Sequence, residues 1–132
     1  MNSIRDMIIG YHTLVYSNDA VATRAFFRDV LGWPSLDAGE GWLIFKTPPT
    51  EMGVHPTDPS GQHGAASVPH HQLSIMCDDI DSTVAELRDR GATFDGDVSD
   101  EGFGVVANLE VPGAGAIQLY QPRHPKAFEL LG

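Results

Sequence analysis

The residues most able to bind a metal or to orient a ligand are histidines and glutamines near the expected strand ends. The chain has 6 histidines among its 132 residues, including His12, His55 and His71. Imidazole suits zinc, iron or nickel when other good ligands accompany it. Gln72 and Gln118 offer only neutral carbonyl oxygens, which compensate an ion weakly for its lost water shell. These residues predict either a weakened metal site or a pocket that orients the polar groups of a ligand.

The elements that must position these residues occur twice along the chain. Each half is expected to form a strand, a helix and three further strands, and Asn18 and Asp19 are good N-caps for the first helix. When Asp79 is laid on Asp19, Gly91 falls within one place of Gly32, as an internal repeat requires. The expected bounds are 11–19, 20–32, 35–40, 41–49 and 51–56 in the first half, and 71–79, 80–91, 93–102, 104–113 and 116–122 in the second.

Length and composition favour one domain of about 4–56 and 70–123, joined by a linker at 57–69 that is rich in Gly, Ser and Pro. The net charge of -10 disfavours nucleic acid and anionic membranes as partners. No apolar run approaches the roughly 20 residues that a membrane span needs, and the start of the chain lacks the basic region of a signal peptide. Cys77 is the single cysteine, so neither an intrachain disulfide nor a cysteine-based zinc cluster is expected. A cytoplasmic location fits these features.

Two stretches carry a family resemblance. HTLVYSND followed by AFFRDVLGW in the first half, and PGAGAIQLYQP in the second, resemble the vicinal oxygen chelate superfamily of glyoxalases, bleomycin resistance proteins and extradiol dioxygenases. The resemblance implies an α+β fold in which two βαβββ modules form a concave half-barrel sheet, with the helices on its outer face. Short motifs of this kind indicate the fold well but say little about the reaction.

The resemblance also implies metal ligands, usually His and Glu, at four strand positions. His12 matches the first position, because it stands seven places before Asp19, the cap of the first expected helix. Seven places before Asp79, the cap of the second expected helix, stands Gln72 rather than His71. The closing strand has Gln118 in place of the family's Glu. The remaining position is Gly53, which has no ligand. The resemblance therefore implies a degenerate metal site, although a β-bulge at the start of the strand would turn His71 inward and favour a metal enzyme.

Aromatic and apolar residues are expected to form the wall of the cup. In the stretch WLIFK, Trp42 and Ile44 point to one face and the alternate residues to the other, so both faces are apolar. Two apolar faces indicate helices on one side and a pocket or a partner subunit on the other. The residues expected to bind the ligand are His12, Tyr16, Trp42, His55, Gln72, Phe103, Gln118 and Tyr120.

The lost anionic ligands favour a binding protein that sequesters a hydrophobic aromatic compound, such as an antibiotic, without metal. The alternative is a metal-dependent enzyme with an altered ligand set, of the glyoxalase or dioxygenase type, in which zinc or iron is bound. A third possibility is a module with a filled core and no ligand. Independently of these functions, His12 is either a core or pocket-wall histidine or a residue that contacts the metal or the ligand. No catalytic residue can be assigned. The resemblance implies a homodimer, in which the modules pair either within one chain or by exchange between the two chains.

Overall fold

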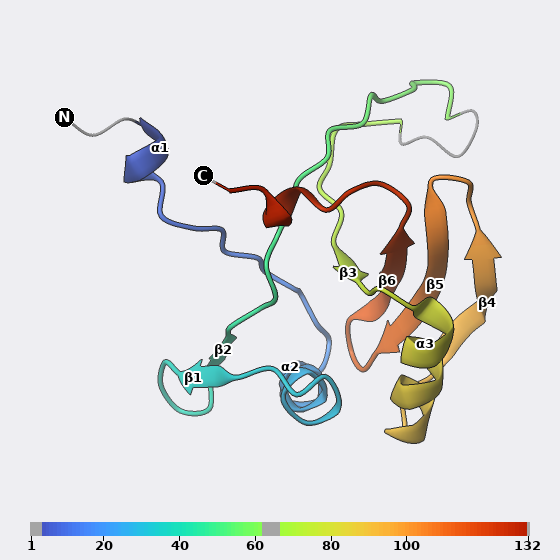
Figure 1. Cartoon of the computed structure of the whole chain (residues 1–132). Coiled ribbons are helices and arrows are strands. Elements are labelled where there is room, and N and C mark those ends of the chain that lie inside the picture. The colour runs from blue at the N-terminus through green and yellow to red at the C-terminus, as the bar shows by residue number, and fades with distance from the viewer. Residues whose placement is uncertain (1–3, 62–66, 132) are drawn as a thin grey trace.

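The computed structural model describes residues 4–61 and 67–131, so part of the expected linker lies outside the described residues. Figure 1 shows a mixed sheet with helix α3 lying along it, and the first half of the chain spread out beside them. The sheet has the strand order β3-β6-β5-β4, in which β3 and β6 are parallel and the other neighbours are antiparallel. The α+β class expected from the sequence is confirmed.

The second half forms the complete module that the sequence predicts, one strand, one helix and three strands. Its elements are β3 (Ser74–Met76), α3 (Ile80–Asp89), β4 (Phe94–Asp100), β5 (Gly104–Val111) and β6 (Gly115–Pro122). The Asp79 side chain caps α3 by accepting a hydrogen bond from the Ser82 amide at 3.2 Å. Gly91 follows the helix with φ +92, a conformation that favours glycine at a helix end.

The first half forms a helix and a hairpin. Its elements are α1 (Ile4–Met7), α2 (Ala20–Ala25), the π-helical η1 (Phe26–Val30), β1 (Ser35–Asp37) and β2 (Leu43–Phe45). The Asp19 side chain caps α2 through the Ala22 amide, as predicted. Together α2 and η1 occupy the range expected for one helix, while β1 and β2 pair antiparallel over three residues each.

The prediction and the structure differ at two segments, 11–19 and 51–56, for which strands are expected. Both segments are extended, but neither is a strand in the described chain. A hydrogen bond of 3.3 Å from the Tyr11 hydroxyl to the Met52 thioether brings the two segments close. Side chains that alternate in type along the chain with a period of two favour an extended backbone. Such a segment becomes a strand only when a neighbouring backbone forms a ladder of hydrogen bonds with it.

The core lies between one face of the sheet and the helices α3 and η1. The predicted apolar face of α3, Ile80, Val84 and Leu87, is buried against β5 and β6. The other members of this core are Phe26, Phe27, Ala92, Ala107, Leu109, Val111, Ile117 and Leu119. The helices α3 and η1 therefore cover a single face of the four-stranded sheet and leave its other face free of these helices.

Two contacts at the start of α2 join the halves. The Asn18 amide donates to the Gly113 carbonyl at 2.8 Å, and the buried Thr23 hydroxyl donates to the Pro112 carbonyl at 2.5 Å. The chain ends in a short 3-10 helix, η3 (Ala127–Glu129), which lies beside the segment after β2 in Figure 1. In the described ranges, none of the helices has the length and apolar character needed to cross a bilayer.

Candidate functional site

The sheet face opposite α3 carries a row of polar and apolar side chains. In β6, Ile117 and Leu119 enter the core, so Gln118 and Tyr120 point to the other face. The strand register places Ser74 and Asn108 beside Gln118, and Met76 and Val106 beside Tyr120. We call these residues the site face: Ser74, Met76, Val106, Asn108, Gln118 and Tyr120.

The polar centre of the site face is a neutral hydrogen-bonded pair. The Ser74 hydroxyl donates to the Gln118 side-chain oxygen at 3.1 Å. The Gln118 side-chain oxygen therefore faces β3, and its amide NH2 group is left to donate elsewhere. Gln118 is half-buried and carries no charge. The position that the resemblance assigns to a glutamate therefore offers amide and hydroxyl groups to a ligand.

The aromatic end of the site face is built around Tyr120. Its ring lies 5.8 Å from the Phe103 ring at 56° and 5.8 Å from the His124 ring at 46°. Gly104 gives the Tyr120 ring its space, because a Cβ atom there would collide with the ring. Burial and the nearby Glu51 carboxylate raise the pKa of the Tyr120 hydroxyl, so this group stays protonated and can donate a hydrogen bond.

Glu51 belongs to this site, although the sequence analysis did not select it. Its side chain is only 16% exposed, and Oε2 lies 3.5 Å from His124 Nε2. Oε1 accepts a hydrogen bond from the Ala127 amide at 2.9 Å. The signal was present in the sequence, because Glu51 stands two places before Gly53, and side chains two places apart on an extended segment share a face.

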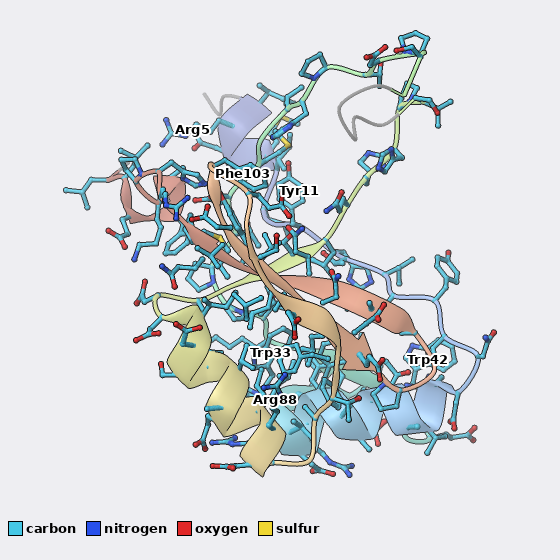
Figure 2. The ribbon with its side chains drawn as sticks, turned by 90° about the vertical axis from the view of Figure 1, so that its right-hand side faces the viewer. Arg5, Tyr11, Trp33, Trp42, Arg88 and Phe103 are labelled. Atoms are coloured by element: carbon cyan, nitrogen blue, oxygen red, sulfur yellow. The ribbon has the colours of Figure 1, made fainter. Side chains whose placement is uncertain are left out.

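The structure brings three of the eight predicted residues together. Phe103, Gln118 and Tyr120 lie on or beside the site face. The other five lie outside hydrogen-bonded strands, with exposed side chains; these are His12, Tyr16, Trp42, His55 and Gln72. In Figure 2 the Trp42 side chain lies at the opposite end of the molecule from Phe103. The Arg24 guanidinium lies over the Trp42 ring, 4.7 Å from its centroid.

Groups that could hold a metal are sparse in the part of the chain that the structure describes. Within residues 4–61 and 67–131, three or more His, Cys, Asp or Glu side chains do not gather in any one place. Glu51 and His124 form a pair of suitable groups, whereas tight zinc sites use at least three protein ligands. Burial raises the pKa of the Cys77 thiol, which keeps it protonated and unreactive.

A cavity of about 580 Å³ lies on the other side of the sheet, between η1 and α3. Its lining includes Leu87, Leu109 and Leu119 together with Arg90. The Arg90 guanidinium already donates to the Glu86 carboxylate and to the Val30 carbonyl, each at 3.1 Å. The lining is therefore largely apolar, and its Arg90 side chain is engaged within the protein.

Comparison with known proteins agrees with this architecture. The model of the Glyoxalase/Bleomycin resistance protein/Dioxygenase superfamily matches residues 11–109. The chain belongs to this superfamily. The resemblance to the vicinal oxygen chelate proteins, which was read from short sequence stretches, is thereby confirmed. None of the curated proteins matches the chain.

Three solved structures share the superfamily fold with this chain. A glyoxalase/bleomycin resistance protein/dioxygenase from Nocardioides has 16% identity and a TM-score of 0.54, with 98% of this chain and 96% of that chain covered. Lactoylglutathione lyase from Agrobacterium tumefaciens has 16% identity and a TM-score of 0.56, with 82% and 89% covered. TnmS3, an antibiotic binding protein from Streptomyces sp. CB03234, has 22% identity and a TM-score of 0.53, with 83% and 90% covered.

Proposed function

We propose that this member of the superfamily binds a small aromatic molecule on the site face and sequesters it without metal or chemistry. The observation that carries the proposal is the aromatic pair of Phe103 and Tyr120 beside the neutral pair of Ser74 and Gln118. The antibiotic-binding protein among the similar structures supports this class of function within the shared fold. A hydrophobic natural product such as an antibiotic fits these groups.

The chemistry of the site face suits a flat ligand with a few polar substituents. An aromatic ring stacked on Phe103 or Tyr120 gains about 0.5–1.5 kcal/mol beyond the burial of its area. The protonated Tyr120 hydroxyl donates a hydrogen bond, and the Gln118 amide both donates and accepts. Such neutral groups orient a ligand without requiring it to carry a charge.

The site face supports this proposal better than the cavity between η1 and α3 does. Ligand sites combine apolar surface with a few polar groups directed at the ligand. At the cavity the Thr83 hydroxyl donates to the Asp79 carbonyl at 2.7 Å, and Arg90 is held by Glu86 and Val30. A ligand there would gain apolar contact but would compete with the protein for its polar contacts.

We further propose that the chain forms a homodimer in which a second copy completes the cup. The segment 11–17 is extended, and the large apolar side chains of Tyr11, Leu14 and Tyr16 are exposed. In the described chain β3 is hydrogen-bonded on one side only, to β6. An open strand edge and an extended segment are complementary surfaces, because the free backbone N–H groups of each can bond to the free C=O groups of the other. Light scattering should therefore give twice the mass of one chain, and a monomeric mass at micromolar concentration would contradict the dimer.

Calorimetric titration with a panel of aromatic natural products tests the proposed binding. We expect Phe103→Ala to weaken the affinity for any bound compound about tenfold, because the exposed ring is removed without disturbing the core. Val68→Ala is the matched control, since Val68 is a similarly exposed apolar residue outside the site face. Binding that is insensitive to Phe103→Ala, or a complete lack of binding across the panel, would count against the site face.

A metal-dependent enzyme is the second candidate function, and His12 at the family's first ligand position favours it. Elemental analysis of protein purified without chelator separates the two candidates. The binding proposal predicts that zinc, iron, manganese and nickel are all substoichiometric. One bound equivalent of any of these metals per chain would favour the enzyme over the binding protein. His12→Ala would then be expected to release the metal.

A further inference from the structure

The segment after β6 is held to the rest of the molecule by contacts to three separate parts of the chain. We call residues 123–130 the C-terminal strap. Arg123 forms a bidentate ion pair with Asp100 of β4, with both nitrogen to oxygen distances at 2.7 Å. The Lys126 ammonium lies 2.8 Å from the Asp78 carboxylate before α3. The third contact reaches the first half, where Glu51 accepts a hydrogen bond from the backbone of η3.

The strap crosses the aromatic end of the site face. Its His124 ring packs against the ring of Tyr120, and the Arg123 amide donates to the Phe103 carbonyl at 3.3 Å. Figure 1 shows η3 beside the segment that follows β2, and a loop joins it to the end of β6. The strap therefore lies beside the two aromatic residues on which we propose that the ligand stacks.

The three contacts differ in their exposure to water. The Asp78 and Asp100 side chains are 86% and 63% exposed, whereas the Glu51 side chain is 16% exposed. Exposed ion pairs contribute little because water and salt screen them, while a shielded hydrogen bond to a carboxylate contributes more. The Ala127 amide also depends on Glu51 for its partner in the described structure. Glu51 is therefore the contact that determines whether η3 stays in place.

His124 adds a second interaction at the same point. Its Nδ1 lies 2.8 Å from the Pro125 carbonyl oxygen. A carbonyl oxygen only accepts, so Nδ1 carries a proton. In the doubly protonated ring Nε2 carries a second proton and pairs with the Glu51 carboxylate. Glu51 thus holds the backbone of η3, and it also pairs with the ring that covers Tyr120 when that ring is charged.

We infer that the C-terminal strap is a gate over the aromatic end of the site face and that Glu51 holds it closed. Release of the Glu51 contact frees η3 and His124, while the Arg123 amide, bonded to the Phe103 carbonyl, retains the start of the strap and acts as its hinge. A ligand reaches Tyr120 when the strap opens. The assignment of the gate to ligand entry rests on the proposed function, whereas the opening itself does not.

Hydrogen exchange of the intact protein tests whether Glu51 holds the strap. Glu51→Ala should speed exchange of the amides at 127–130 about tenfold, because it removes a hydrogen bond to a charged acceptor. Glu51→Gln keeps an acceptor for Ala127 and should have a smaller effect. Glu129→Ala is the control, since it removes only an exposed ion pair with Lys126. Wild-type exchange rates in Glu51→Ala would overturn the inference.

Acetylation of tyrosine by N-acetylimidazole, mapped by mass spectrometry, tests whether the strap covers Tyr120. We expect Tyr120 to react about tenfold faster in Glu51→Ala than in the wild type, while the exposed Tyr16 reacts at an unchanged rate. Loss of the Glu51 charge alone alters the reactivity of Tyr120. Glu51→Gln controls for this effect, because it removes the charge but keeps an acceptor for the Ala127 amide. An equal acceleration in both variants, or none, would overturn the gate. Neither readout requires a ligand, so a failure of the gate stays distinct from a failure of the binding proposal.

Discussion

The two halves of the chain have the same order of sequence patterns, yet only the second half forms a strand, a helix and three further strands in the described structure. In the second half β5 and β6 pair over eight residues each, and β3 and β4 extend the sheet on both sides. In the first half β1 and β2 pair over three residues each. The comparison shows that a repeated pattern fixes the local conformation of both halves, while the number of available neighbours decides which of them becomes a sheet.

The difference extends to the distribution of apolar surface. The second half has its core side chains between the sheet and α3, where Leu109 and Leu119 are fully enclosed. The first half leaves large apolar side chains in contact with water, among them Tyr11, Leu14, Tyr16, Val21, Leu36, Trp42 and Val54. Such an exposed apolar surface is typical of an interaction site. It fits the proposal that a second copy covers the first half.

The largest expected contrast comes from truncating one leucine in each half. Leu109→Ala should destabilise the protein by about 2–5 kcal/mol, because it leaves a cavity where the side chain is 0% exposed. Leu36→Ala should cost less than about 0.5 kcal/mol, because this side chain is 61% exposed. Urea denaturation measures both values at low protein concentration. A large loss for Leu36→Ala would show that the first half is packed in solution, as in the proposed dimer.

A pair of glycines gives the next contrast. At Gly104 a Cβ atom would lie 2.6 Å from the Gln121 carbonyl oxygen and would also meet the Tyr120 ring, so Gly104→Ala should cost about 1–3 kcal/mol. At Gly10 a Cβ atom would meet nothing within 4 Å, so Gly10→Ala should be neutral or slightly stabilising. Thermal unfolding followed by circular dichroism compares the two variants. Equal losses would mean that residue 10 has a close neighbour in solution.

The equivalent helix caps test whether the halves unfold together. Replacing either Asp19 or Asp79 by Ala removes a side-chain bond to the first turn and should cost about 1 kcal/mol locally. We expect Asp79→Ala to lower the midpoint of global unfolding, because α3 covers the complete sheet. Asp19→Ala should instead speed hydrogen exchange in residues 20–30 with less change in the midpoint. Identical effects on the midpoint would indicate one cooperative unit.

The smallest contrast concerns two Arg–Asp pairs. Arg123 and the Gly102 amide hold the pKa of Asp100 well below its ordinary value of 3.8. A carboxyl group whose pKa falls on folding stabilises the fold above its ordinary pKa, and this contribution is lost as the pH falls. Asp100→Asn should therefore lower the Tm slightly at pH 7, with the difference from wild type shrinking below about pH 4. Asp29→Asn should change the Tm less, because its partner Arg28 is its neighbour in the chain.

Much of the second half could be predicted from its sequence. The period of Ile80, Val84 and Leu87, the cap at Asp79 and the glycine after α3 are local signals, and each acts within about one helical turn. The alternation of β6 likewise separates Gln118 and Tyr120 from the core residues between and beside them. These signals need no knowledge of distant contacts, which is why they predicted α3, β5 and β6 and the face of β6 that carries Gln118 and Tyr120.

The rest of the site depends on contacts that join distant positions. Glu51 and Ala127 are 76 residues apart, and no local pattern indicates that a carboxylate would meet that amide. The alternation in 11–19 predicts an extended segment but cannot specify its neighbours, so the expected strand has no ladder in the described chain. The positions of His12, Tyr16, Trp42, His55 and Gln72 relative to the cup depend on those missing neighbours.

The sequence by itself determined the superfamily, the order of elements in the second half, the helix caps and the face of β6 that carries Gln118 and Tyr120. These properties follow from backbone preferences and side-chain periodicities that act between residues close in the chain. The tertiary structure alone decided which face of the sheet the helices cover and that Glu51 holds the C-terminal strap beside Tyr120. Those features require segments far apart in sequence to meet, and their meeting depends on packing and register across the whole chain.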